Sequence, residues 1–291
     1  MYGKIIVPLD GSRLAEQILP YVRWFASACD ARVELLLVND PDVATGFFPP
    51  LEGGGYLEQV RDRYLRSVSR VDMVTETGKP AAVIVDRAGA GTDSLIAMAT
   101  HGLSGIQRWL LGSVTSKVVQ AARASLLLIR PAKGQDPSAD IRLRTVFVPL
   151  DGSALAENAL ARAVELARKT DLEIHLVRVY GLPPDAYILG DGVYMNALMQ
   201  QREAIRREAE SYLESKVEEL RAQGLERVLS SAIAGDPAGD IIDLASRTPD
   251  NLIAMSTHGR SGIQRWIMGS VTEKVVHYSR DPVLVVRPAG G

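Results

Sequence analysis

Short, almost uninterrupted apolar runs alternate with stretches of helical periodicity along the chain. In the first half, the runs that predict strands are Lys4–Leu9, Val33–Val38, Met73–Thr77, part of Asp93–Ala99, and Leu126–Ile129. The stretches between them predict helices over Ser12–Ala28, over Tyr56–Arg70, from Pro80 onward, and over Ser113–Arg123. Runs that are apolar at nearly every position indicate strands buried on both faces. The alternation therefore predicts an α/β fold of βαβ units around a parallel sheet.

The second half of the chain repeats the first. The segment Pro8–Ser12 (Pro-Leu-Asp-Gly-Ser) returns 141 residues later as Pro149–Ser153, and Thr100–Gly102 returns after 157 residues. Between Ala99–Pro131 and Ser256–Pro288, 20 of 33 positions are identical, which chance cannot produce. The chain is therefore a tandem duplication of one unit.

The duplication sets the expected domain boundaries. We predict a first domain over residues 1–133, a linker over 134–141 and a second domain over 142–291. The second copy has 16 extra residues in its middle, around the helical stretch Tyr194–Gln223. That stretch is rich in Glu, Arg, Ala and Leu. Within it, the Arg- and Glu-rich part Arg202–Glu219 is most simply a charged helix face with i,i+4 pairs.

A glycine-rich segment after the fourth predicted strand has the features of a phosphate-binding loop. It covers Thr100–Thr115 and recurs as Thr257–Thr272. Gly102 lacks a Cβ, so a ligand can approach its backbone. Gly112 and Ser113 place free N–H groups at a helix N-terminus, where the helix dipole favours an anion, and the Ser113 and Thr115 hydroxyls add donors. Because the arrangement occurs twice with its spacing intact, we interpret it as a binding loop rather than a helix cap.

These motifs resemble the universal stress protein family over nearly the whole chain, as two fused copies. The family's nucleotide-binding members carry Gly, two residues, Gly, nine residues, Gly, and then Ser or Thr. The last part of that pattern is present as Gly102 to Gly112-Ser113 and as Gly259 to Gly269-Ser270, with Ala99 and Ser256 in place of the first Gly. The resemblance implies two tandem open five-stranded parallel sheets of order 3-2-1-4-5, with helices on both faces, in a Rossmann-like, adenine-nucleotide α-hydrolase-like fold.

The resemblance also implies a nucleotide in the crevice between the first and fourth strands, where the strand order reverses. The end of the first strand and the Val after the second line the adenine and ribose, and the glycine-rich loop holds the phosphates. The implied residues of the first copy are Pro8, Leu9, Asp10, Val38, Ala99, His101, Gly102, Gly112, Ser113, Val114 and Thr115. Those of the second copy are Pro149, Leu150, Asp151, Val179, Ser256, His258, Gly259, Gly269, Ser270, Val271 and Thr272.

The expected ligand is ATP, or AMP or ADP, with magnesium accompanying the triphosphate and no metal site made by the protein alone. The resemblance further implies pairing through the last strand of each copy. Leu126–Ile129 and Val283–Val286 would then pair within one chain as an internal pseudo-dimer, and two such chains would associate.

Composition narrows the range of partners. With 33 Lys and Arg against 35 Asp and Glu, the net charge is −2, which argues against a nucleic-acid-binding protein. Cys29 is the only cysteine, so neither an intrachain disulfide nor a cysteine metal site is expected. No apolar run approaches a membrane span, and Pro8 and Asp10 end the short N-terminal apolar stretch, unlike a signal peptide. We expect a cytoplasmic protein without a membrane partner.

Two alternatives stay open at this point. One is a nucleotide-free interaction protein of the same fold, which Ala99 and Ser256 favour and the repeated loops oppose. The other is an enzyme that cleaves ATP slowly. No catalytic residue is predicted, because Ser12 and Ser153 have no His at fixed spacing and no Gly-x-Ser-x-Gly motif occurs. A Walker A motif is also absent, and Gly89-Ala90-Gly91 is interpreted as a helix C-terminal turn.

Overall fold

The structure, a computed structural model, describes residues 1–42, 53–89, 93–100, 111–132, 134–181, 192–257 and 268–287, with the backbone alone at 53–54 and 192–198. The strands of the first half are β1 (Lys4–Leu9), β2 (Arg32–Asn39), β3 (Val71–Thr77), β4 (Ser94–Ala99) and β5 (Ser125–Ile129). Its helices are α1 (Arg13–Glu16), α2 (Leu19–Cys29), α3 (Gly53–Tyr64), α4 (Pro80–Ala88) and α5 (Ser113–Ala121). The predicted strands are all present, within two residues of the expected starts.

The second half repeats this order of strands and helices. Its strands are β6 (Thr145–Pro149), β7 (Glu173–Tyr180), β8 (Val228–Ala234), β9 (Asn251–Ser256) and β10 (Val283–Val286). Its helices are α6 (Ala154–Ala167), α7 (Gly192–Ala222), α8 (Pro237–Ser246) and α9 (Ser270–Tyr278). The α/β class is therefore confirmed for both copies.

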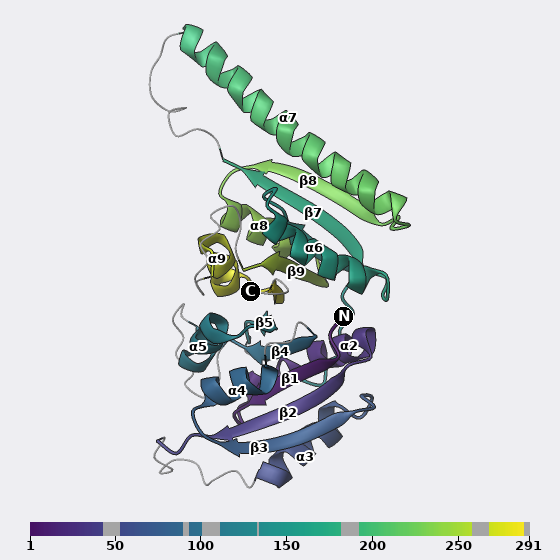
Figure 1. Cartoon of the computed structure of the whole chain (residues 1–291), viewed down its shortest axis with the longest axis vertical. Helices are drawn as coiled ribbons and strands as arrows, with labels where there is room; N and C mark the ends of the chain where they lie inside the picture. Colours follow the sequence, from purple (N-terminus) through teal and green to yellow (C-terminus); the bar gives the residue numbers. More distant parts are fainter. Residues whose placement is uncertain are drawn as a thin grey trace.

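In the described part of the chain, all ten strands belong to one sheet, of order β3-β2-β1-β4-β5-β10-β9-β6-β7-β8. Each half has the order that the resemblance implies, and its own strands are parallel. The two halves meet at β5 and β10, which pair antiparallel, with Leu127 opposite Leu284 (Figure 1). The predicted intrachain pairing of the last strands is thus confirmed. It corrects the expectation of two separate sheets, because each last strand covers the edge of the other half's sheet.

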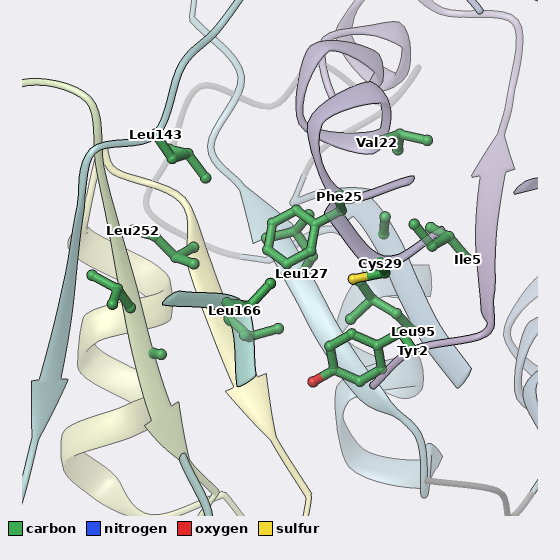
Figure 2. Close-up of a cluster of buried hydrophobic side chains, with 14 of the residues drawn as sticks. Tyr2, Ile5, Val22, Phe25, Cys29, Leu95, Leu127, Leu143, Leu166 and Leu252 are labelled. Carbon is green, nitrogen blue, oxygen red and sulfur yellow. The ribbon is translucent and has the colours of Figure 1, made fainter. Parts of the chain in front are cut away.

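The central strands of this sheet are buried on both faces, and the core continues across the seam between the halves. Every residue of β4, β5 and β9 is buried. Figure 2 shows part of one core cluster, in which Tyr2, Phe25 and Leu127 of the first half gather with Leu143, Leu166 and Leu252 of the second. Since the same cluster contains residues of both halves, we expect the halves to unfold together.

The prediction of one continuous helix over Ser12–Ala28 is wrong, because the structure has two helices there, α1 and α2, separated by Gln17 and Ile18. Pro20 stands in the first turn of α2. A proline has no N–H to donate to the carbonyl of Glu16, so a continuous helix would be interrupted there. The second half has Ala161 at the matching position, and α6 runs unbroken.

The largest difference between the halves is the helix before the third strand of each copy. α7 has 31 residues and α3 has 12. Figure 1 shows α7 running along β8 and continuing well beyond it. Along its exposed face, Arg206 pairs with Glu203 and Glu210, as the sequence predicted for a solvated helix. Within the described residues, no helix combines the length and the apolar character that crossing a bilayer requires.

Candidate nucleotide site

The turn after the first strand of each half has the same geometry twice. Asp10 Oδ1 accepts a hydrogen bond from the Ser12 N–H at 3.0 Å, and Asp151 Oδ1 accepts one from the Ser153 N–H at 3.0 Å. The glycine between them has a positive φ, +84° at Gly11 and +85° at Gly152. Residues other than glycine rarely adopt this backbone conformation, so the turn favours glycine at this position. The sequence Asp-Gly-Ser therefore fixes a tight turn at each strand end.

Both serines of these turns also cap the helix that follows. Ser12 Oγ accepts from the Ala15 N–H at 3.1 Å, and Ser153 Oγ accepts from the Ala156 N–H at 3.2 Å. Each serine hydroxyl is thus committed to a helix N-terminus.

The helices that follow the glycine-rich loops begin differently. Gly112 and Gly269 are the N-cap residues of α5 and α9, and glycine brings no side chain to accept from the first-turn N–H groups. The exposed Ser113 and Ser270 are the first helical residues. By contrast, α1, α6 and α8 each have a Ser or Asp side chain as cap. The starts of α5 and α9 are therefore suited to an anion from outside the chain.

Hydrogen bonds hold the two ends of each glycine-rich loop together. The Gly112 N–H donates to the Thr100 carbonyl at 2.8 Å, and the Gly269 N–H donates to the Thr257 carbonyl at 2.7 Å. Each helix start is thereby fixed beside the end of β4 or β9. The predicted residues His101, Gly102, His258 and Gly259 lie outside the described residues.

Thr115 and Thr272 have a structural role that the sequence did not reveal. Both side chains are buried, and their hydroxyls donate to the carbonyls of Ala99 and Ser256, at 3.3 and 2.9 Å. The prediction that Thr115 offers a free hydroxyl donor to phosphate is wrong for this reason. Instead, these hydroxyls tie the first turn of each helix to the preceding strand.

The sheet topology brings the turn and the helix start to the same edge. β1 pairs with both β2 and β4, and β6 pairs with both β7 and β9, all parallel. The carboxyl ends of these strands therefore lie side by side, and the strand order reverses there. In open α/β sheets, ligands bind at this kind of position.

In the second half these elements enclose a cavity of about 210 Å³. Nine predicted residues line it: Pro149, Leu150, Asp151, Val179, Ser256, Gly269, Ser270, Val271 and Thr272. The sequence analysis missed five further lining residues, Ala156, Val177, Pro237, Ile241 and Met255. Pro237 and Ile241 come from α8, a helix far along the chain from the motifs, and no local pattern connects it to them. The walls are mostly apolar, with the Asp151 carboxylate and the start of α9, which has no side-chain cap.

In the first half, the matching residues occupy the same places in the fold. Pro8 and Leu9 end β1, Val38 is near the end of β2, and Ala99 ends β4. Asp10 begins the turn, and Gly112, Ser113 and Val114 form the start of α5. The two sets of predicted residues are therefore brought together in the same manner, apart from those outside the described residues.

The rims of the two sites differ in charge. In the first half, Lys79 pairs with Asp40 at 3.3 Å and with Asp42. The Asp42 backbone N–H and Lys79 lower the pKa of the Asp40 carboxyl. The second half has Asp236 where the first has Lys79, and its side chain caps α8. Lys79 is exposed in both of its ion pairs, so these pairs change the local charge more than the stability.

The described side chains indicate no metal centre. Among the described residues, no group of three or more His, Cys, Asp or Glu side chains could hold a metal ion. The lone Cys29 is buried, and burial raises the pKa of its thiol to about 11.

Comparison with known proteins agrees with this architecture. The Universal stress protein family matches residues 1–130 and 142–287. The chain belongs to the universal stress protein family. Universal stress protein Rv2005c of Mycobacterium tuberculosis is 26% identical over 303 residues, covering 97% of this chain and 96% of that protein. Universal stress protein MJ0531 of Methanocaldococcus jannaschii is 28% identical over 144 residues, covering 50% of this chain and 82% of that protein. The resemblance inferred from the motifs is thus confirmed.

A solved structure has the same fold across both halves of this universal stress protein. It is a universal stress protein from Archaeoglobus fulgidus, with a TM-score of 0.65 and 20% identity, covering 99% of each chain. At this identity the likeness concerns the fold, and the ligand has to be argued from the site itself.

Proposed function

We propose that this tandem universal stress protein binds an adenine nucleotide in each half and acts as a stress-response binding or signalling module. The observation that carries the proposal is the second-half cavity. It joins apolar walls, the Asp151 turn and the uncapped start of α9 in one place. In an adenine nucleotide, the base would contact the apolar walls, the ribose the Asp151 turn, and the phosphates the start of α9.

The apolar walls suit a base. Val177, Val179 and Met255 offer aliphatic and thioether surface, which excludes water from one side of a planar ring. Asp151 lines the same cavity, and its carboxylate is an acceptor of the kind that ribose hydroxyls need. Its Oδ1 closes the Asp-Gly-Ser turn by accepting hydrogen bonds from the Ser153 N–H and hydroxyl.

The start of α9 suits the phosphates. The backbone N–H groups following Gly269, the Ser270 hydroxyl and the helix dipole all favour a negative group. Magnesium would be held chiefly by the phosphates, since this cation retains several waters and takes few protein ligands. Asp151 is the carboxylate among the residues that line the cavity, and we assign it to the ribose, so we expect at most slow hydrolysis.

The test is to identify what the protein carries. We would denature protein purified without added nucleotide and identify any released nucleotide by chromatography and mass. The matched variant is Ser270→Asp, which places a carboxylate where the phosphate would lie. An acidic residue in the first turn favours the helix itself, so this variant should fold. Gln120→Glu adds the same charge elsewhere, at an exposed position of α5.

We expect adenine nucleotide from the wild type and from Gln120→Glu, and less from Ser270→Asp. If the purified proteins carry nothing, the same three are titrated with ATP and magnesium. No binding at millimolar ATP would overturn the proposal and favour the nucleotide-free interaction protein. ATP turnover well above background would favour the enzyme.

A further inference from the structure

Three further carboxylates border the second-half cavity, namely Asp236, Asp240 and Glu273. Each is the sequence neighbour of a cavity-lining residue, at the N-cap or in the first turns of α8 or α9. Asp236 caps α8 by accepting a hydrogen bond from the Gly239 N–H at 2.9 Å. The Asp240 carboxylate lies against Gly235, where a Cβ would meet its Oδ2 at 2.0 Å. Because Gly235 directly follows β8, this carboxylate lies at the carboxyl edge of the sheet, as the cavity does.

The matching positions of the first half hold Lys79, Val83 and Ser116, so none of them is acidic. Lys79 pairs with Asp40 at 3.3 Å and with Asp42, and both carboxylates follow β2 at the same edge of the sheet. One cation and two carboxylates leave this rim with a single negative charge. The three carboxylates of the second-half rim carry three, so the two rims differ by two charges.

Other charges in the neighbouring elements do not cancel this difference. Lys117 of α5 and Lys274 of α9 occupy matching positions, and α4 and α8 both begin with proline, so their dipoles contribute similarly. Helix α3 has two cations and two anions, and the 202–210 stretch of α7 has three of each. In the sequence, segments 43–52 and 101–110 together carry one of each, and segments 182–191 and 258–267 together carry two of each.

We propose that the rim charges give the two halves different nucleotide preferences, with the first half favouring ATP over AMP more strongly than the second half does. This inference rests on the proposed function. The carboxylates form no site of their own and act on the proposed nucleotide site through their electric field. Each further phosphate adds negative charge, which three carboxylates repel more strongly than a nearly balanced rim does. Specificity is a difference between two affinities, and repulsion of the wrong ligand is sufficient to create it.

The competing explanation is that the halves differ in the shape of their sites rather than in charge. Salt separates the two explanations. At low ionic strength the Debye length is about 30 Å, so all of the rim charges act on a bound phosphate chain. At about 1 M salt it falls to about 3 Å, and a preference that depends on the exposed rim charges is lost. A preference that depends on shape persists.

The experiment measures the ratio of the AMP dissociation constant to the ATP dissociation constant for one site at a time in the full chain. A Ser270→Asp background leaves the first-half site, and a Ser113→Asp background leaves the second-half site. Both are titrated by calorimetry at low salt with EDTA, so that no cation offsets the phosphate charge. If ATP binds only with magnesium, adenosine and AMP give the same comparison for a single phosphate. We expect the ratio to be about 3- to 10-fold higher in the first half.

The matched variants remove charge from one rim. In the Ser113→Asp background, Asp236→Asn together with Asp240→Asn should raise the ratio to that of the first half. Asparagine also caps helices, so this protein should fold, which thermal unfolding checks. The control, Asp30→Asn with Asp171→Asn, removes two exposed charges at the opposite edge of the sheet and should leave the ratio unchanged.

Equal ratios in the two halves, a difference that persists at about 1 M salt, or an equal shift in the control would overturn this inference alone. If only the second-half site binds, the comparison of its rim variant with the control decides. If only the first-half site binds, Lys79→Gln should lower its ratio about 2-fold, and an unchanged ratio would overturn the inference. If the wild type and both backgrounds bind neither nucleotide, with or without magnesium, the proposed function fails and this inference fails with it.

Discussion

At the position where the first half has Glu34, the second half has His175, and the two halves stabilise this part of the sheet differently. Glu34 is buried and paired with Lys4 at 3.0 Å and with Arg87 at 2.6 Å. His175 shares a hydrogen bond of 2.8 Å with Ser231 and packs on the Phe147 ring. An ionic network in one copy is thus replaced by a neutral pair in the other.

The two candidate nucleotide sites differ far less between the halves than the contacts of Glu34 and His175 do. The turn geometry, the capping serines, the glycine N-caps and the threonine hydroxyl bonds all recur with distances that agree within 0.4 Å. The elements beside them differ in length, in charge and in continuity, as α3 and α7 show. The comparison teaches that the two copies share the features that a common ligand needs and differ in those that set stability.

The largest expected effect comes from breaking the seam that joins the halves. Leu284→Ala removes a fully buried side chain opposite Leu127, and we expect a loss of about 2–5 kcal/mol in the free energy of unfolding. Denaturant unfolding, followed by circular dichroism, measures it. Leu229→Ala on the half-exposed side of β8 is the control, with an expected loss of about 0.5 kcal/mol or less.

Because the core crosses the seam, the Leu284→Ala protein should still unfold in one transition, with its midpoint lowered. Two separate transitions in the wild type would contradict the single continuous core. Unchanged stability of the variant would contradict the role of the seam itself.

The second expected effect is that the two halves lose stability at different pH values. Burial lowers the pKa of His175 below 6.5, so the unfolded chain binds a proton there more readily than the folded chain. The stability from neutral His175 is therefore present above pH 6.5 and is lost as the pH falls through its folded pKa. Burial opposes ionisation of Glu34, but hydrogen bonds from Arg87 and Lys4 outweigh it and lower the pKa of this group. Its contribution is present above pH 4.5 and is lost only at lower pH.

We therefore expect acidification below pH 6.5 to weaken the second half before the first. Hydrogen exchange at pH 7 and pH 5.5, compared peptide by peptide at matched chemical exchange rates, would show faster opening around β7 and β8. His175→Gln should remove this difference, whereas Glu34→Gln should leave it. Equal loss of protection in both halves would contradict the assignment to His175.

The smallest expected effect concerns the charge at the two helix starts. Glu273 lies in the first turn of α9, where α5 has Ser116. A carboxylate there competes with a bound phosphate for the helix dipole, so Glu273→Ser should tighten ATP binding in the second half about 2- to 5-fold. Titration in a Ser113→Asp background measures this change. The reverse change, Ser116→Glu, should weaken ATP binding at the first-half site to a similar extent. Weaker binding in Glu273→Ser, or tighter binding in Ser116→Glu, would contradict the account.

The sequence predicted most of the fold and the centre of the site because both depend on short motifs that occur twice. Gly112-Ser113 was identified from neighbouring residues, and Pro8–Asp10 from the resemblance to the family. The break at Pro20 was missed because helical periodicity continues on both sides of it. Ile241 and Met255 could not be predicted as lining residues, since the packing of distant elements brings them to the site. The buried hydroxyl of Thr115 was missed for the same reason.

The most direct test of the central claim is the number of ATP molecules that one chain binds. Calorimetric titration of nucleotide-free wild-type protein with ATP and magnesium should give two sites per chain. Ser113→Asp and Ser270→Asp should each retain one site, and the double variant none. No binding to the wild type, or binding that persists in the double variant, would contradict the account of a nucleotide held at each helix start.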